Sequence, residues 1–131
     1  MPILQASAGS ADRPTVLIVD DDPAVRNSLK FSLEIEGYEV TTFNRACDVL
    51  RIALPAAACL VVDQNLPGMG GLDLLRELRR RGENIAAVLI TSNPPLLLRE
   101  RAAAAGVPIV EKPLLGNALV DTIRTEIDRR H

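Results

Sequence analysis

The sequence predicts an α/β domain built on a parallel sheet. Short aliphatic runs alternate with segments in which leucine, isoleucine and valine recur at helical spacing, and glycine or proline separates many of them. Five strands alternating with five helices indicate parallel strands joined by right-handed crossovers. The length of 131 residues and the apolar fraction of 47% suit one domain with one core.

Strands are predicted where short aliphatic runs stand between turn residues. The runs at 16–19, 59–62 and 87–90 are continuously apolar, which is typical of strands covered on both faces. The second strand is predicted at 39–43, and a short fifth strand at 108–110. The sheet therefore has little exposed surface of its own.

Helices are predicted from apolar spacing and from end signals. The first begins at Pro23, with Asp22 as N-cap, and ends at Gly37. The second is weaker and stops before Pro55, and the fourth ends at Gly106. The spans predicted for the second to fifth helices are 45–54, 72–81, 94–105 and 117–128.

Composition excludes several classes of protein. The formal net charge of −2 argues against a general nucleic-acid or anionic-membrane binder. No stretch approaches the 18 to 20 apolar residues of a membrane span, and the N-terminus lacks a signal pattern, so a cytoplasmic location is expected. Cys47 and Cys59 match no metal or redox spacing, and Cys59 is expected to be buried. We expect a loose tail over 1–14 and a single domain over 15–131.

Polar side chains follow four of the five predicted strands. In a parallel sheet the carboxyl ends meet at one edge, where ligands bind near the switch in strand order. Taken singly, each of these residues is most often a helix cap, a turn residue or a surface charge. Together they predict a site built from Asp20, Asp21, Asp22, Asp63, Thr91, Ser92, Glu111 and Lys112.

This pattern resembles the receiver domain of two-component response regulators. The resemblance rests on VLIVDDDPAVR, LVVDQNLPGMGGLDLL, VLITS and VEKP, and extends from about Val16 to Ile127. It implies a flavodoxin-like, doubly wound, five-stranded parallel sheet of order 2-1-3-4-5. It also implies a signalling switch in a phosphorelay, which catalyses its own phosphotransfer and slow autodephosphorylation. The implied partner is a sensor histidine kinase or a histidine phosphotransfer protein.

The resemblance assigns roles to individual residues. Asp63 matches the carboxylate that accepts the phosphoryl group, which would form an acyl phosphate. Thr91 matches the hydroxyl that hydrogen-bonds this group, and Lys112 the lysine that pairs with Asp63 before transfer and with a phosphoryl oxygen afterwards. Compact ammonium charge suits that place, and only one other lysine, Lys30, occurs in the chain.

A divalent metal site is implied beside the acceptor. Asp20 and Asp21 match the paired acids that hold the metal, and Asp21 is the more direct ligand. Asp63 and the backbone carbonyl of Asn65 would complete the protein ligands. Mg²⁺ is the expected ion, because it prefers oxygen ligands and bridges to phosphate oxygens. Asp22 is left with the role of helix cap, which the helix dipole favours.

Two departures from the family pattern leave alternatives open. Ile109 stands where receivers usually carry an aromatic residue that moves on activation. Asn93 and Pro94 either stiffen the loop after the fourth strand or serve as N-cap and first residue of the fourth helix. A degenerate receiver that binds partners regardless of phosphorylation is therefore a second hypothesis. A flavin or nucleotide binder ranks far below, because three acids replace the phosphate-binding loop.

Two surface features complete the sequence-based picture. Leu96, Leu97 and Leu98 cannot share one narrow stripe of a helix, so at least one is expected to face solvent. Helix four, strand five and helix five are a candidate partner or homodimer surface. The run Arg79–Arg81 is expected to be a solvated helix end, where cations are favoured, and direct nucleic-acid binding is not expected.

Overall fold

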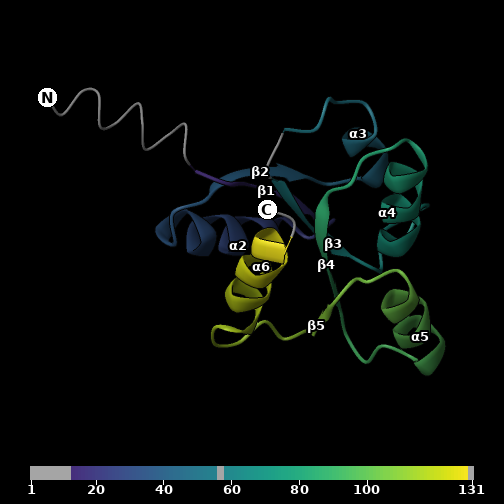
Figure 1. The fold of residues 1–131 in the computed structure, drawn as a ribbon. Helices are drawn as coiled ribbons and strands as arrows, with labels where there is room; N and C mark the ends of the chain where they lie inside the picture. Colours follow the sequence, from purple (N-terminus) through teal and green to yellow (C-terminus); the bar gives the residue numbers. More distant parts are fainter. Residues whose placement is uncertain (1–12, 56–57, 130–131) are drawn as a thin grey trace, which may run out of the picture.

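A five-stranded parallel sheet carries helices on both of its faces (Figure 1). The computed structural model describes residues 13–55 and 58–129. The strand order β2-β1-β3-β4-β5 confirms the predicted order. The strands are β1 (Thr15–Val19), β2 (Glu39–Phe43), β3 (Ala58–Asp63), β4 (Ala86–Thr91) and β5 (Ile109–Glu111). The helices are α2 (Pro23–Ile35), α3 (Ala46–Val49), α4 (Gly71–Arg80), α5 (Leu96–Ala104) and α6 (Ala118–Arg129).

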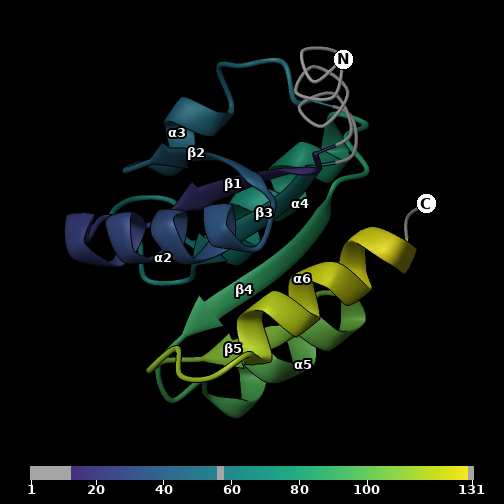
Figure 2. The same ribbon diagram turned by 90° about the vertical axis from the view of Figure 1, so that its left-hand side faces the viewer.

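The two faces of the sheet carry separate hydrophobic clusters. Helices α2 and α6 cover one face, and α3, α4 and α5 cover the other (Figures 1 and 2). Because side chains alternate along a strand, Val16 and Ile18 of β1 join the cluster under α2 and α6. Leu17 and Val19 join the other cluster. Burial on both faces explains why β1, β3 and β4 are continuously apolar in sequence.

The register of the strands brings the predicted polar residues to one edge. Val19, the last residue of β1, pairs with Val62, one residue before the end of β3, and Thr91 and Glu111, the last residues of β4 and β5, pair with each other. The Lys112 amide continues this pairing by donating to the Thr91 carbonyl over 2.8 Å. The polar residues at these ends are Asp20, Asp63, Thr91 and Lys112.

Most element ends agree with the sequence-based expectations. The Asp22 side chain accepts a hydrogen bond from the Ala24 amide at 2.9 Å, which confirms Asp22 as N-cap of α2, with Pro23 at the first helical position. Gly37 follows this helix with a φ of 99°, a conformation that favours glycine. Cys59 is fully buried in β3, as predicted.

The second predicted helix is much shorter than expected. Residues 45–54 form only one helical turn, α3. Its N-cap Arg45 makes no side-chain capping bond, and only Ala46 and Val49 of its residues are buried. Tighter turns follow, in which the Arg51 amide donates to the Asp48 carbonyl and the Ile52 amide donates to the Val49 carbonyl, each three residues earlier. Without a cap or a longer buried stripe, the helix ends in tight turns.

The start of the fourth predicted helix is also corrected. Helix α5 begins at Leu96 with Pro95 at the N-cap, so Asn93 and Pro94 are not the N-cap and first residue. A residue that precedes proline is disfavoured in the α region, which excludes Pro94 from the helix because Pro95 follows it. Asn93 has a φ of 44°, and Pro94 is buried.

The predicted N-terminal tail is described only at its end. Residues 1–12 of the predicted tail lie outside the described residues, whereas the Pro14 carbonyl accepts a hydrogen bond from the Glu39 amide at 3.0 Å. The hydrogen bonding of the sheet therefore already includes Pro14.

Within residues 13–55 and 58–129, no helix is long and apolar enough to cross a membrane.

Candidate functional site

Four chain segments deliver the predicted polar side chains to the carboxyl edge of the sheet. Asp20 follows β1, Asp63 ends β3, Thr91 ends β4, and Lys112 follows β5. Asp20, Asp63 and Thr91 are buried, with exposed fractions of 0%, 4% and 2%, whereas Asp21 is exposed. Two carboxylates that are almost fully buried need charge compensation within the protein or from a ligand.

Lys112 supplies part of this compensation by joining both buried carboxylates. Its Nζ atom lies 3.1 Å from Asp63 Oδ2 and 3.2 Å from Asp20 Oδ2. The side chain is only 24% exposed. The ammonium group is therefore partly desolvated, and dissolved ions screen its charge only weakly. The contact with Asp63 is the one the sequence predicted, and the contact with Asp20 is additional.

The pKa values of Asp20 and Lys112 reflect this arrangement. Burial raises the pKa of the Asp20 carboxyl, and the nearby Asp63 charge adds to the rise, while the Asp22 amide and Lys112 oppose it. Burial alone would lower the pKa of Lys112. Hydrogen bonds and attraction to Asp63 and Asp20 outweigh that effect together, so the pKa of Lys112 is raised. The site holds more negative charge than Lys112 neutralises.

Backbone amides orient the two buried carboxylates. The Asp22 amide donates to Asp20 Oδ1 at 2.9 Å, and the Asn65 amide donates to Asp63 Oδ1 at 3.1 Å. Arg26 Nη1 also donates to the Asp20 backbone carbonyl at 2.7 Å. Each carboxylate therefore presents its Oδ2 atom to Lys112 and its Oδ1 atom to the loop that follows its strand. Sequence reasoning missed Arg26, because its position on α2 carries no distinctive signal.

The predicted metal ligands lie together. One carboxylate oxygen from each of Asp20, Asp21 and Asp63 falls within 4.8 Å of the others. Oxygen ligands of this kind suit Mg²⁺. The exposed Asp21 leaves one side of the group open to solvent, as an ion that keeps several waters requires. The donor set and its excess of negative charge therefore fit a divalent cation.

Thr91 and Asn65 lie beside Asp63 on the side of α5. The Asn65 Nδ2 atom lies 3.5 Å from Thr91 Oγ1, at the outer limit of a hydrogen bond. Both residues line a hollow of about 430 Å³ together with Ser92, Asn93 and Arg101. Open space therefore lies beside Thr91 and beside Asn65, which follows Asp63 closely in the chain.

Gly71 allows α4 to begin directly against Asp63. A Cβ atom at this position would lie 2.7 Å from the Asp63 carbonyl oxygen and 2.8 Å from Leu89 Cδ1, closer than real Cβ atoms come. Only glycine fits this approach without a shift of the backbone. The sequence motif contains two adjacent glycines, but nothing in it indicates which of them touches Asp63.

Comparison with known proteins identifies the family. The model of the response regulator receiver domain matches residues 16–124. The chain belongs to this family. It is similar to the transcriptional regulatory protein FixJ of Azorhizobium caulinodans, with 36% identity over 116 residues, which cover 87% of this chain and 55% of that protein. It is 34% identical to nodulation protein W of Bradyrhizobium diazoefficiens, covering 92% of this chain and 55% of that protein.

Solved structures of response regulators share the receiver fold. The low-resolution structure of response regulator StyR has a TM-score of 0.82 at 36% identity, covering 90% of this chain and 63% of that chain. The crystal structure of FixJ-N has a TM-score of 0.81 at 32% identity, covering 89% of this chain and 95% of that chain. The receiver chain spans about half the length of the curated relatives it matches.

The receiver's departures from the usual pattern lie along β5 and α5. Ile109 is partly buried and packs against the cluster under α5. Leu96 and Leu97 are 70% and 58% exposed, whereas Leu98 packs on that cluster, so the expectation of a solvent-facing leucine is confirmed. An aliphatic side chain thus occupies the place where an aromatic residue was expected.

The arginine run at the end of α4 is only partly a solvated end. Arg80 and Arg81 are exposed and pair with Glu77 at 2.6 and 3.0 Å. Arg79 is half-buried, and its Nη1 atom donates to the Ala105 carbonyl. The expectation of three solvated arginines is therefore wrong for Arg79, which ties α4 to α5.

Proposed function

We propose that this receiver domain accepts a phosphoryl group on Asp63 from a phosphohistidine. The donor would be a sensor histidine kinase or a histidine phosphotransfer protein. One observation carries the proposal: the buried Asp63 carboxylate contacts the Lys112 ammonium and belongs to a group of acidic oxygens suited to Mg²⁺. Family membership supports the same reaction class.

The transfer needs positioning and charge neutralisation more than covalent assistance. An Asp63 oxygen attacks the phosphorus atom of the donor, an O–P bond forms and the N–P bond breaks. The departing imidazole nitrogen keeps the electron pair of that bond and takes a proton. The Asn65 amide holds Asp63 Oδ1 in place, and Lys112 stabilises the charge that moves toward the acceptor.

Asp20, Asp21, Asp63 and the backbone carbonyl of Asn65 would hold Mg²⁺. When bound, this ion would neutralise charge on the transferred phosphoryl oxygens. Residues of the chain itself orient the carboxylates that would bind this ion. The Asp22 amide fixes one oxygen of Asp20, and Lys112 separates Asp20 from Asp63 by contacting both.

Thr91 and Lys112 would form new contacts when Asp63 is phosphorylated. Thr91 borders the hollow that Asn65 also lines, and its hydroxyl can donate to a phosphoryl oxygen. Lys112 would exchange its contact with the free carboxylate for one with the phosphoryl group. The Lys112 amide is bonded to the Thr91 carbonyl, so movement at either residue is transmitted to β5. Attack of water on the acyl phosphate would later release phosphate and restore Asp63.

Intact mass measured after incubation with acetyl phosphate and Mg²⁺ tests the proposal. The parent chain should gain the mass of one phosphoryl group, and Asp63→Asn should gain none. No addition to the parent, or equal addition to both chains, would refute it. A degenerate receiver would bind its partners equally well with and without acetyl phosphate. The close approach of Lys112 and the acids to Asp63 favours the phosphorylated switch.

A further inference from the structure

A groove between α4 and α5 combines positively charged and apolar side chains in its lining. It has a volume of about 370 Å³ and lies on the face of the sheet away from α2 and α6 (Figure 1). We call it the α4–α5 groove. Its lining residues are Leu72, Arg76, Arg101, Ala104 and Ala105.

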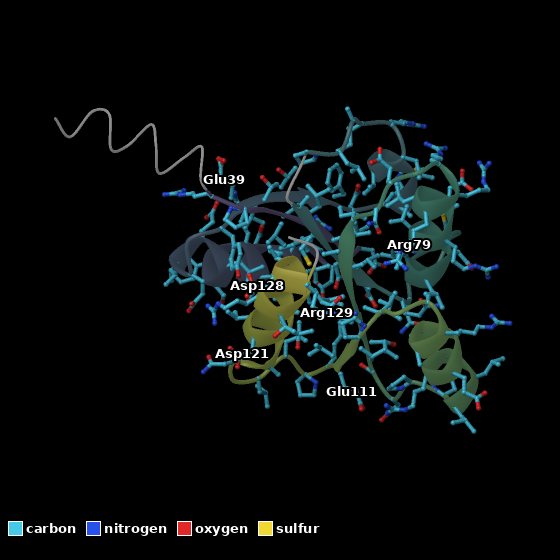
Figure 3. All side chains as sticks on the ribbon, viewed as in Figure 1. Glu39, Arg79, Glu111, Asp121, Asp128 and Arg129 are labelled. Atoms are coloured by element: carbon cyan, nitrogen blue, oxygen red, sulfur yellow. The ribbon has the colours of Figure 1, made fainter. Side chains whose placement is uncertain are left out.

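The spacing of residues on α4 places Arg76 and Arg79 on the side of the helix that faces α5. Leu72, Arg76 and Arg79 are separated by four and three positions, which places them on one stripe of the helix. Arg79 crosses to α5 and donates to the Ala105 carbonyl, so the two helices are tied at one end of the groove. Side chains tipped with nitrogen project outward from α4 and α5, on the side where Arg79 is labelled (Figure 3).

The two arginines that line the groove differ from Arg80 and Arg99 in forming no ion pair within the described part of the chain. Arg80 pairs with Glu77, and Arg99 pairs with Glu111 at 2.9 Å. Within residues 13–55 and 58–129, the structure gives the side chains of Arg76 and Arg101 neither an ion pair nor a hydrogen bond. Two exposed guanidinium groups therefore stand free at one groove of a chain whose net charge is negative.

We propose that the α4–α5 groove binds an acidic segment of a partner protein, in which carboxylates flank an aliphatic side chain. Guanidinium groups match carboxylates through paired hydrogen bonds, which gives both charge and geometric complementarity. Leu72, Ala104 and Ala105 supply the apolar part of the lining, which suits an aliphatic side chain. A nucleic-acid backbone would gain nothing from this apolar lining and needs a wider basic footprint.

The groove adjoins the proposed phosphorylation site without belonging to it. Arg101 also lines the hollow that contains Asn65 and Thr91, whereas Arg76 lines only the α4–α5 groove. A partner segment in the groove would therefore lie beside the region that changes on phosphorylation. Binding of the segment does not require Asp63, so the inference is tested on the unphosphorylated chain.

Fluorescence anisotropy with synthetic peptides tests this inference. The probes are three labelled peptides in which two glutamates flank one leucine at spacings of two, three and four residues, each with a control in which lysine replaces glutamate. At least one acidic peptide should bind, and its lysine control should not. Arg76→Glu and Arg101→Glu should each weaken binding by about tenfold or more.

Arg13→Glu is the matched control, because it makes the same change of charge elsewhere. Arg13 is exposed and lines a separate hollow with Glu39, which Figure 3 places far from Arg79. It should change peptide affinity by less than about threefold. Equal losses for all three variants, or no binding of any acidic peptide, would overturn the inference. Tighter binding of single-stranded DNA that depends on Arg76 and Arg101 would also overturn it, as would self-association through these residues.

Discussion

Lys112 holds two buried carboxylates that would otherwise repel each other. Asp20 and Asp63 are almost fully buried, and each places one oxygen within 3.2 Å of the ammonium group. Removing one partner of such a group leaves charge buried without compensation, which costs more than the contact itself contributes. Lys112 therefore neutralises only part of the negative charge of Asp20 and Asp63.

Replacing Lys112 with alanine should lower the free energy of unfolding by about 1–3 kcal/mol without metal, allowing for the partial exposure of the lysine. Urea unfolding followed by circular dichroism measures this loss. Lys30→Ala is the control, because Lys30 pairs with Glu34 at the surface, and it should change stability by less than about 0.5 kcal/mol. Equal losses in the two variants would show that Lys112 is no more than a surface charge.

The convergence of the site residues could be predicted because it follows from topology. Once Asp20, Asp63, Thr91 and Lys112 are placed after parallel strands, the sheet brings them together. The second contact of Lys112 could not be predicted, because it depends on side-chain distances within a few tenths of an ångström. The same holds for Gly71, whose role is set by how closely α4 approaches the Asp63 carbonyl.

The helices show where sequence signals are sufficient and where they are not. Helix α2 has a capping residue, a proline at its start and a glycine after its end, and its bounds were predicted closely. Helix α3 lacks a capping side chain and a long buried stripe, so its predicted length was wrong. Helix α5 starts later than predicted because Pro95 follows Pro94. The prediction treated Pro94 as a first helical residue and did not include the effect of Pro95, which disfavours the α region at the residue before it.

The end of α4 gives a pH-dependent prediction. Hydrogen bonds from Arg80 and Arg81 lower the pKa of Glu77 from 4.5 to about 2. A carboxyl whose pKa is lower in the folded state stabilises the fold above pH 4.5, and this contribution is lost as the pH falls toward 2. The parent should therefore be more stable than Glu77→Gln at pH 6, and the difference should shrink toward zero near pH 2. Urea unfolding across this range measures it, and a difference independent of pH would contradict the assignment.

At the scale of the whole molecule, the acidic edge should couple metal binding to stability. Mg²⁺ at ten times its dissociation constant should add about 1.4 kcal/mol to the free energy of unfolding and raise the melting temperature by roughly 5 °C. Asp21→Asn should blunt this rise. Asp22→Asn is the control, because it removes the neighbouring charge and keeps a residue able to cap α2. A rise that survives in Asp21→Asn, or one lost equally in both variants, would count against the predicted ligands.

The exposed leucines of α5 give a prediction about assembly. We expect the receiver to form a homodimer through α5, β5 and α6, since Leu96 and Leu97 are exposed on α5. Light scattering should report a dimer for the parent and a monomer for Leu97→Ser. Phe31→Ser is the control, because Phe31 is a large apolar residue that is also exposed, at 68%, but lies on α2. A parent that is monomeric at all accessible concentrations would refute the dimer.

The identity of the phosphorylated residue is the most direct test of the account. Borohydride reduces an acyl phosphate on aspartate to an alcohol and releases phosphate, so it marks the acceptor permanently. The receiver would be incubated with acetyl phosphate and Mg²⁺, reduced, digested and mapped by tandem mass spectrometry. The account predicts reduction at Asp63 alone, because Asp63 is the carboxylate in contact with Lys112 that also accepts a hydrogen bond from the amide of Asn65, a residue lining the hollow beside Thr91. Reduction at Asp20 or Asp21, or at no aspartate, would contradict it.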